Sequence, residues 1–152
     1  DEVGHVDGAG PETAHLVFSP LHTLSAPQSI HRIIDVFPGD LQGQIRAGLS
    51  ESLKAVVSQT LFKRVDKKGR VAALEVLVGL PSVRNLIREG KTFQINSVIE
   101  TGSKFGMQKL DDAIMALLQK KIISPEEAYS KAVEKKPFKN YLTRAPEDFT
   151  EG

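Results

Sequence analysis

The sequence contains no cysteine among its 152 residues. This absence excludes disulfide scaffolds, thiolate zinc sites and cysteine nucleophiles, and it is compatible with a reducing cytoplasm. No apolar run approaches the roughly 18 to 20 residues that a membrane-spanning helix needs. The acidic, glycine-bearing start also lacks the basic and apolar regions of a signal peptide. We therefore expect a soluble, intracellular protein with no direct membrane insertion.

Neither sign of charge is in surplus, because 20 Lys and Arg stand against 19 Asp and Glu. The field of the whole molecule gives no steering toward nucleic acid or an anionic membrane, so we expect no nucleic-acid partner. The basic cluster at 63–68 could meet phosphate, but charged hairpin tips are usually just solvated. No aromatic residues are interleaved with it to support nucleic-acid readout.

Several catalytic and nucleotide-binding motifs are missing. No G-x-x-x-x-G-K-[ST] segment is present to hold the β- and γ-phosphates of a nucleotide. A G-x-S-x-G nucleophile elbow and a Rossmann glycine pattern are absent as well. The four histidines show no H-E-x-x-H spacing, so we expect no metal site.

What is present predicts a domain that alternates strands and helices. The 40% hydrophobic content is enough for a core without disulfides or metal. Apolar periodicity and turn residues indicate the order of elements. The predicted elements are a strand at 15–18, helices at 25–37 and 41–57, strands at 59–65 and 70–78, and helices beginning at Pro81, near Ile95, near Met107 and at Pro125.

The two later strands read as an antiparallel hairpin, because 66–69 contains an Asp and a Gly that favour a tight polar loop. The run at 70–78 is apolar at nearly every position, which suggests cover on both faces and so a mixed sheet. Gly90 suits the C′ position of the helix after Pro81, and Ser124 with Glu127 suits a capping box. The tail beyond Lys135 shows no periodicity.

His15 and His22 bracket the first predicted strand, and they are the first candidates for chemistry. An imidazole can donate a hydrogen bond to a phosphate oxygen or shuttle a proton near neutral pH, and a strand end is where doubly wound sheets place ligands. Without further context, such a pair is more often structural than catalytic.

The second candidate is the helical run Val83-Arg84-Asn85-Leu86-Ile87-Arg88-Glu89. Arg84 and Arg88 are four residues apart and share one helical face, away from the apolar stripe of the same helix. Such a face could grip an acidic neighbour. An ordinary solvated face on a packed helix is the alternative, and the pattern alone favours it.

Taken together, these segments resemble the PilT family of type IV pilus retraction ATPases, within the secretion ATPase superfamily. The resemblance covers 12–132 and includes a His box at 12–23, its continuation at 30–38, and the segments 49–59 and 70–75. The most specific match is 83–89, which resembles the A-I-R-N-L-I-R-E signature of retraction ATPases.

The resemblance implies a hexameric, ring-forming motor that uses ATP and Mg to power pilus retraction and twitching motility. It implies a cytoplasmic protein, peripheral to the inner membrane through the pilus inner-membrane platform. It also implies that His15 and His22 lie near the γ-phosphate as catalytic residues, and that the run from Val83 to Glu89 couples hydrolysis to retraction.

The fold implied is α/β: a partial RecA-like P-loop NTPase domain, with a mixed sheet that includes an antiparallel hairpin, followed by a C-terminal helical cap. The expected organisation is an irregular stretch at 1–11, the C-terminal part of a RecA-like core at 12–79, a helical subdomain at 80–135 and a tail at 136–152. The Walker A loop and the expected Walker B segment are absent from the sequence. We therefore expect no tight nucleotide binding and no ATP hydrolysis by these residues alone.

Two other functions stay open at this point. One is a non-enzymatic interaction module of the pilus or type II secretion machinery that keeps the fold and binds through a helical face. The other is part of a type II secretion or pilus-extension ATPase. Those ATPases usually carry a cysteine-rich zinc insertion, so the absence of cysteine favours the retraction branch.

Overall fold

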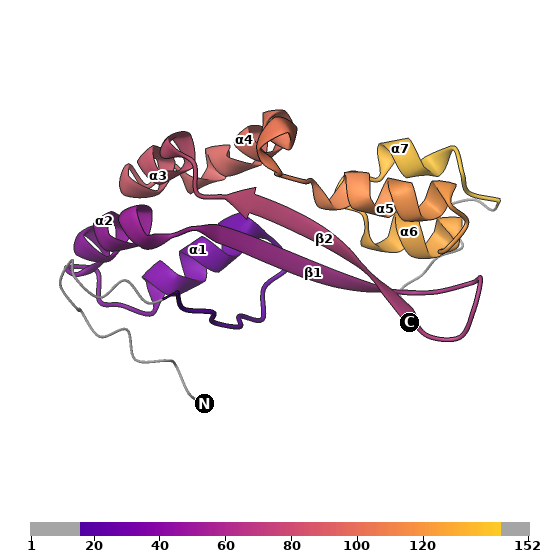
Figure 1. Ribbon diagram of the computed structural model, residues 1–152, viewed down its shortest axis with the longest axis horizontal. Coiled ribbons are helices and arrows are strands. Elements are labelled where there is room, and N and C mark those ends of the chain that lie inside the picture. Colours follow the sequence, from indigo (N-terminus) through magenta and orange to yellow (C-terminus); the bar gives the residue numbers. More distant parts are fainter. Residues whose placement is uncertain (1–15, 144–152) are drawn as a thin grey trace.

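The computed structural model describes residues 16–143, in which a long β-hairpin runs between two groups of helices (Figure 1). Helices α1 to α4 gather at one end of the hairpin and α5 to α7 at the other. The elements in chain order are α1 (Ala26–Asp35), α2 (Gln42–Ser52), β1 (Ala55–Lys63), β2 (Arg70–Val78), α3 (Pro81–Arg88), η1 (Thr92–Gln94), α4 (Ile95–Thr101), η2 (Ser103–Phe105), α5 (Leu110–Gln119), α6 (Pro125–Lys131) and α7 (Lys136–Lys139). No helix within residues 16–143 is long and apolar enough to cross a membrane.

The hairpin pairs β1 with β2 in antiparallel register, from Ala55 opposite Val78 to Lys63 opposite Arg70. Its residues alternate between two faces, and the face that includes Phe62 and Leu77 is buried beneath the helices. The predicted hairpin is therefore confirmed, and β1 begins earlier than expected. The sheet has only these two strands among the described residues, so the mixed sheet expected from the apolar run at 70–78 is not found there.

The first helical group forms a hydrophobic cluster around β2 and α1. Ser25 caps α1 by accepting a hydrogen bond from the Gln28 backbone N–H at 3.4 Å, and Pro27 lies in the first turn. One face of α1 is then buried. The fully or nearly fully buried members of this cluster are Ala26, Ile30, Ile34, Leu77, Val83, Ile87, Ile95, Ile99 and Met107.

The second helical group packs on the other end of the hairpin. Ser124 caps α6 as predicted, by accepting a hydrogen bond from the Glu127 backbone N–H at 3.1 Å. Glu127 does not close the capping box. Its carboxylate accepts from the Lys63 backbone N–H at 3.0 Å instead, and so ties α6 to the end of β1. The buried members of this cluster are Phe62, Ala73, Leu110, Ile114, Leu118, Ile123, Ala128, Ala132 and Phe138.

The strand predicted at 15–18 is wrong for its described part. Leu16, Val17 and Phe18 have no regular structure, and their side chains are 70%, 77% and 86% exposed. A strand needs a neighbour for its backbone N–H and C=O groups, and no strand within residues 16–143 pairs with this segment. His15 and the irregular stretch at 1–11 lie outside the described residues.

Two boundaries also differ from the prediction. The second helix ends at Ser52, and Val56 and Val57 belong to β1, because β-branched side chains favour the extended backbone that pairs with β2. Within the expected tail, residues 136–139 form α7, and Phe138 is 1% exposed. One buried aromatic ring is too little to produce a periodic signal.

Candidate functional site

The loop before α1 holds the His22 backbone and leaves this residue exposed. The His22 carbonyl oxygen accepts a hydrogen bond from the Arg32 guanidinium at 2.6 Å. Further along, the Thr23 and Ser29 hydroxyls lie 2.5 Å apart, and the Leu24 N–H donates to the Gln28 side chain at 2.8 Å. Each of these bonds joins the loop to α1. A group that bound at His22 would therefore act on α1 directly.

Glu75 on β2 anchors the start of the same helix. Its carboxylate accepts a hydrogen bond from the Ala26 backbone N–H at 2.7 Å, across 49 residues of sequence, and Glu75 is only 8% exposed. Burial raises the pKa of Glu75, the bond from Ala26 works against that rise, and the charge of Asp111 adds to it. The sequence contained no sign of this contact, because Glu75 stands singly in an apolar run.

The raised pKa of Glu75 predicts a pH-dependent stability. At pH values between its ordinary and its raised pKa, the unfolded chain has lost the proton while the folded chain retains it. The stability that this group contributes is present at low pH and is lost as the pH rises through the raised pKa. We expect Glu75→Gln to remove this component and to be at least as stable as the native chain at neutral pH. Urea unfolding of both proteins at acidic and neutral pH measures this pH-dependent component of the free energy of unfolding.

The control for this prediction is Glu75→Ala, which also cannot ionise but leaves the Ala26 N–H without its acceptor. We expect it to be about 1–3 kcal/mol less stable than Glu75→Gln at every pH. Equal stability of the two variants would contradict the proposed anchor. An unchanged pH profile in Glu75→Gln would contradict the titration.

Helix α3 carries the second predicted site and is held rigidly. Pro81 occupies its first turn, and Gly90 follows its end with φ of +70°, a conformation that favours glycine, so both predicted helix signals are confirmed. Val83 and Ile87 are fully buried. Leu86 packs partly buried against the same cluster. This face fixes the helix against the first cluster.

The polar face of α3 divides into an anchored and a free part. Arg84 is half-buried, and its Nε donates to the Gly79 carbonyl oxygen at 2.9 Å. Asn85 and Arg88 are exposed. The Glu89 carboxylate pairs with Lys91 at 2.8 Å, and that bond lowers the pKa of Glu89. The predicted separation of Arg84 and Arg88 from the apolar stripe is thus confirmed, and Arg88 is available to a partner.

His22 and α3 are connected through α1 rather than directly. No hydrogen bond or ion pair joins the two within the described part of the chain. His31, however, adjoins the Arg32 that binds the His22 carbonyl, and its Nε2 lies 2.5 Å from the hydroxyl of the buried Thr92. Thr92 begins η1, shortly after α3 ends. Residues 61 apart meet in this bond, so sequence pattern could not have found it.

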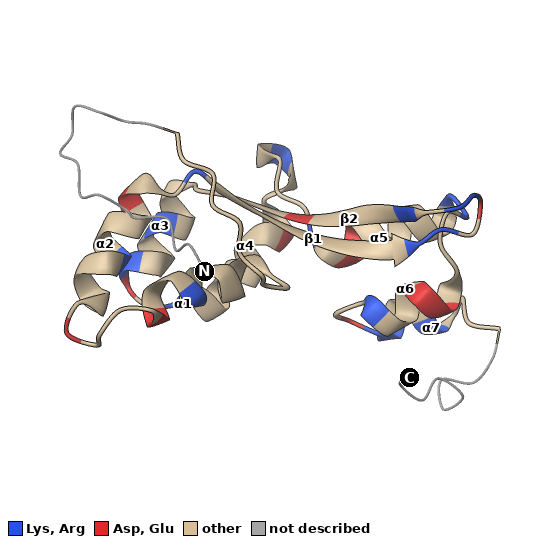
Figure 2. Ribbon diagram, turned by 90° about the horizontal axis from the view of Figure 1, so that it is seen from below, with Lys and Arg blue, Asp and Glu red and all other residues tan. Residues whose placement is uncertain are grey.

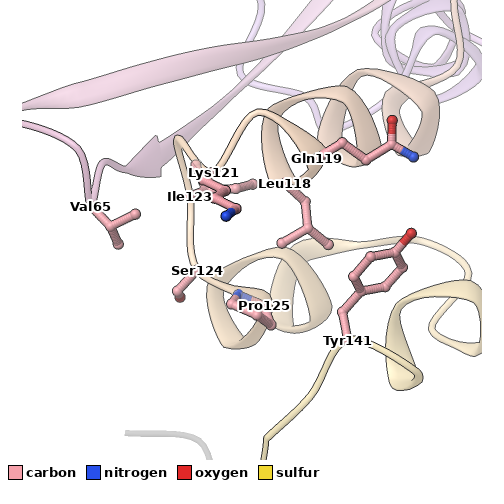
Figure 3. Close-up of a pocket in the computed structure, with 8 residues that line it drawn as sticks. All are labelled: Val65, Leu118, Gln119, Lys121, Ile123, Ser124, Pro125 and Tyr141. Carbon is pink, nitrogen blue, oxygen red and sulfur yellow. The ribbon is translucent and has the colours of Figure 1, made fainter.

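Two hollows lie elsewhere, among the second group of helices and the hairpin tip. One has a volume of about 430 Å³, and the residues that line it are Val65, Leu118, Gln119, Lys121, Ile123, Ser124, Pro125 and Tyr141 (Figure 3). The other is more polar and lies between the hairpin tip and α6. Neither includes His22 or α3. No three His, Cys, Asp or Glu side chains within residues 16–143 are grouped so that they could hold a metal ion.

Comparison with protein-family models finds no match. The chain is 50% identical over 121 residues to a twitching motility protein of Neisseria gonorrhoeae, and 51% identical over 121 residues to the type IV pilus retraction ATPase PilT of Pseudomonas aeruginosa. Each match covers 80% of this chain. Over these residues the chain is homologous to PilT proteins. It spans about a third of the length of these relatives, 32% and 35% respectively.

The PilT homology extends to the fold. A crystal structure of the pilus retraction motor PilT with bound ADP matches 83% of this chain with a TM-score of 0.71 and 37% identity, over 35% of its own length. The resemblance inferred from the His box and the 83–89 run is therefore confirmed at the level of the family. The predicted α/β class is confirmed as well, as a partial match to the RecA-like PilT ATPase.

Proposed function

We propose that these residues form the C-terminal part of a hexameric motor that retracts type IV pili with ATP and Mg. The observation that carries the proposal is the identity of about half the residues to proteins named for pilus retraction and twitching motility. The ADP-bound state of the matching PilT structure supports a nucleotide as ligand. The motor would act from the cytoplasm on the inner-membrane platform of the pilus.

Within this proposal, the loop of His22 senses the nucleotide and α3 transmits the signal. His22 is exposed, and its backbone is bonded to Arg32 of α1. His31 of the same helix is bonded to Thr92, which follows α3. A shift of the loop when the γ-phosphate leaves would thus move α1 and change the position of α3 as one rigid body. His15 would share the phosphate contact with His22.

We propose that the exposed end of α3 contacts the partner that receives the motion. Val83 and Ile87 hold the helix, so motion of the helix carries Arg88 with it. A guanidinium binds carboxylates with two parallel hydrogen bonds, which gives a geometrically specific grip on an acidic partner. Arg84 is already bonded to the Gly79 carbonyl and serves to orient the helix.

The test joins this chain to the remaining two thirds of P. aeruginosa PilT in a strain that lacks PilT. We expect the chimera to hydrolyse Mg-ATP and restore twitching, because its parts are homologous. We expect Arg88→Ala to lower twitching about tenfold while hydrolysis stays within about twofold, since it removes a coupling contact. Lys54→Ala, an exposed cation outside α3, should change neither quantity.

The 152-residue chain alone provides the baseline. It has no phosphate-binding loop, so we expect no magnesium-dependent phosphate release above buffer. Hydrolysis by the chain alone that His22→Ala abolishes would contradict this part of the proposal. A chimera that hydrolyses ATP and assembles but leaves cells without twitching would contradict the retraction function.

A further inference from the structure

Basic residues are concentrated at one end of the molecule. Residues 60–73 and 110–143, which form the hairpin tip with α5, α6 and α7, carry 11 Lys and Arg against six Asp and Glu. The rest of the described chain, which is longer, carries eight Lys and Arg against six Asp and Glu. Lys and Arg are prominent at the hairpin tip and on α6 and α7 in Figure 2. The near-neutral total charge therefore hides an end with an excess of positive charge.

Part of this positive end is concave. A hollow of about 780 Å³ lies between the hairpin tip and α6. Its lining consists of Leu61, Lys63, Lys68, Gly69, Arg70, Glu127 and Lys131. We call it the basic groove. Four cations and one carboxylate contribute to it, so an anion that entered would meet a net positive surface.

One side of the basic groove is fixed in place. The Lys131 ammonium donates to the Leu61 carbonyl oxygen at 2.8 Å and to the Glu127 carboxylate at 2.7 Å, and it lies 5.1 Å from the centre of the Phe62 ring. The pKa of Glu127 is lowered: burial raises it, but the bonds from Lys131 and the Lys63 backbone N–H outweigh burial. The charge of Lys63 also lowers the pKa of Glu127, so Glu127 offsets part of the charge of Lys63 as well as that of Lys131.

The other three cations of the groove are not paired through their side chains among the described residues. The side chains of Lys63, Lys68 and Arg70 make no hydrogen bond and no ion pair within residues 16–143. Lys63 and Arg70 are even direct cross-strand neighbours, a pairing of like charges that destabilises a hairpin. By contrast, Arg64 at the same tip is paired with Asp66 at 2.6 Å. Among the described residues, the side chains of Lys63, Lys68 and Arg70 therefore contribute no hydrogen bond or ion pair to the fold.

We propose that the basic groove binds an extended acidic segment of a partner protein, with several Asp or Glu side chains. Charge complementarity indicates that the partner is negatively charged, and the shape of the groove indicates which class of macromolecule it is. A flat anionic membrane would fit a convex or planar patch better than a hollow, and single-stranded nucleic acid binding relies on stacking aromatics, which the lining lacks. The proposal rests on charge and shape alone and does not depend on the pilus function.

The experiment measures fluorescence anisotropy of a labelled hexaglutamate peptide titrated with the full 152-residue chain at low salt. We expect saturable binding that the double variant Lys68→Glu with Arg70→Glu weakens at least about tenfold, because two cations become anions. The control reverses two exposed cations outside the basic groove, Lys54→Glu with Lys104→Glu, and keeps the same net charge as the double variant. It should bind like the native chain.

The double variant should remain folded, because a glutamate at position 70 would face Lys63 with opposite charge. Thermal unfolding checks this directly. Vesicles of phosphatidylserine and phosphatidylcholine and a fluorescent oligothymidine are titrated in parallel. The proposal would be overturned if the vesicles or the oligothymidine bound more tightly than the peptide. An equal loss of peptide affinity in the control variant, or no peptide binding at low salt, would also overturn it.

Discussion

Replacing Phe138 with alanine is expected to lower the free energy of unfolding by about 3–5 kcal/mol, the usual cost of removing a buried aromatic ring. Phe138 is 1% exposed and belongs to the second hydrophobic cluster together with Phe62 and Ile114. Its removal leaves a cavity between α7 and the rest of this cluster. A loss of this size is a large share of the stability of an ordinary domain.

The matched control is Phe93→Ala, because the Phe93 side chain is 73% exposed. We expect a change within about 0.5 kcal/mol for this surface substitution. Urea unfolding followed by circular dichroism measures both variants. Equal losses would mean that Phe138 does not anchor α7.

Gly79→Ala is expected to destabilise the chain by about 2–3 kcal/mol through overpacking against the backbone. A Cβ at this position would overlap the Leu53 carbonyl oxygen and would lie 3.1 Å from the Lys54 carbonyl oxygen. The backbone cannot move away easily, since the Gly79 N–H donates to that same Lys54 oxygen at 2.7 Å. The substitution would also disturb the Gly79 carbonyl that binds Arg84 and orients α3.

Gly48→Ala is expected to stabilise the same protein, in contrast to Gly79→Ala. Gly48 lies in α2, and a Cβ there would meet no atom within 4 Å. Since glycine is a poor helix residue, we expect a gain of about 0.5–1 kcal/mol. Thermal unfolding of the two alanine variants compares them. A Gly79→Ala protein as stable as the native one would show that the close approach of Leu53 is relieved by a small shift.

Local chemistry explains which elements could be predicted from the sequence. The serine cap of α6, the proline at the start of α3 and Gly90 after its end act within a few residues of their own position, so each could be predicted from the sequence. The antiparallel hairpin was readable for the same reason. The strand predicted at 15–18 failed because a strand depends on a neighbour that the local sequence does not contain.

The resemblance to PilT, the order of the helices and hairpin, and the apolar face of α3 could be predicted from the sequence, because they depend on short-range spacing and on matched motifs. The connection from His22 to α3 emerged from the folded structure, since the His31 to Thr92 bond joins residues 61 apart. The folded structure also decided that Glu75 anchors α1 and that Lys63, Lys68 and Arg70 share one groove. Contacts between distant segments arise from packing. The near-zero total charge of the sequence does not reveal that several cations lie together in the folded protein.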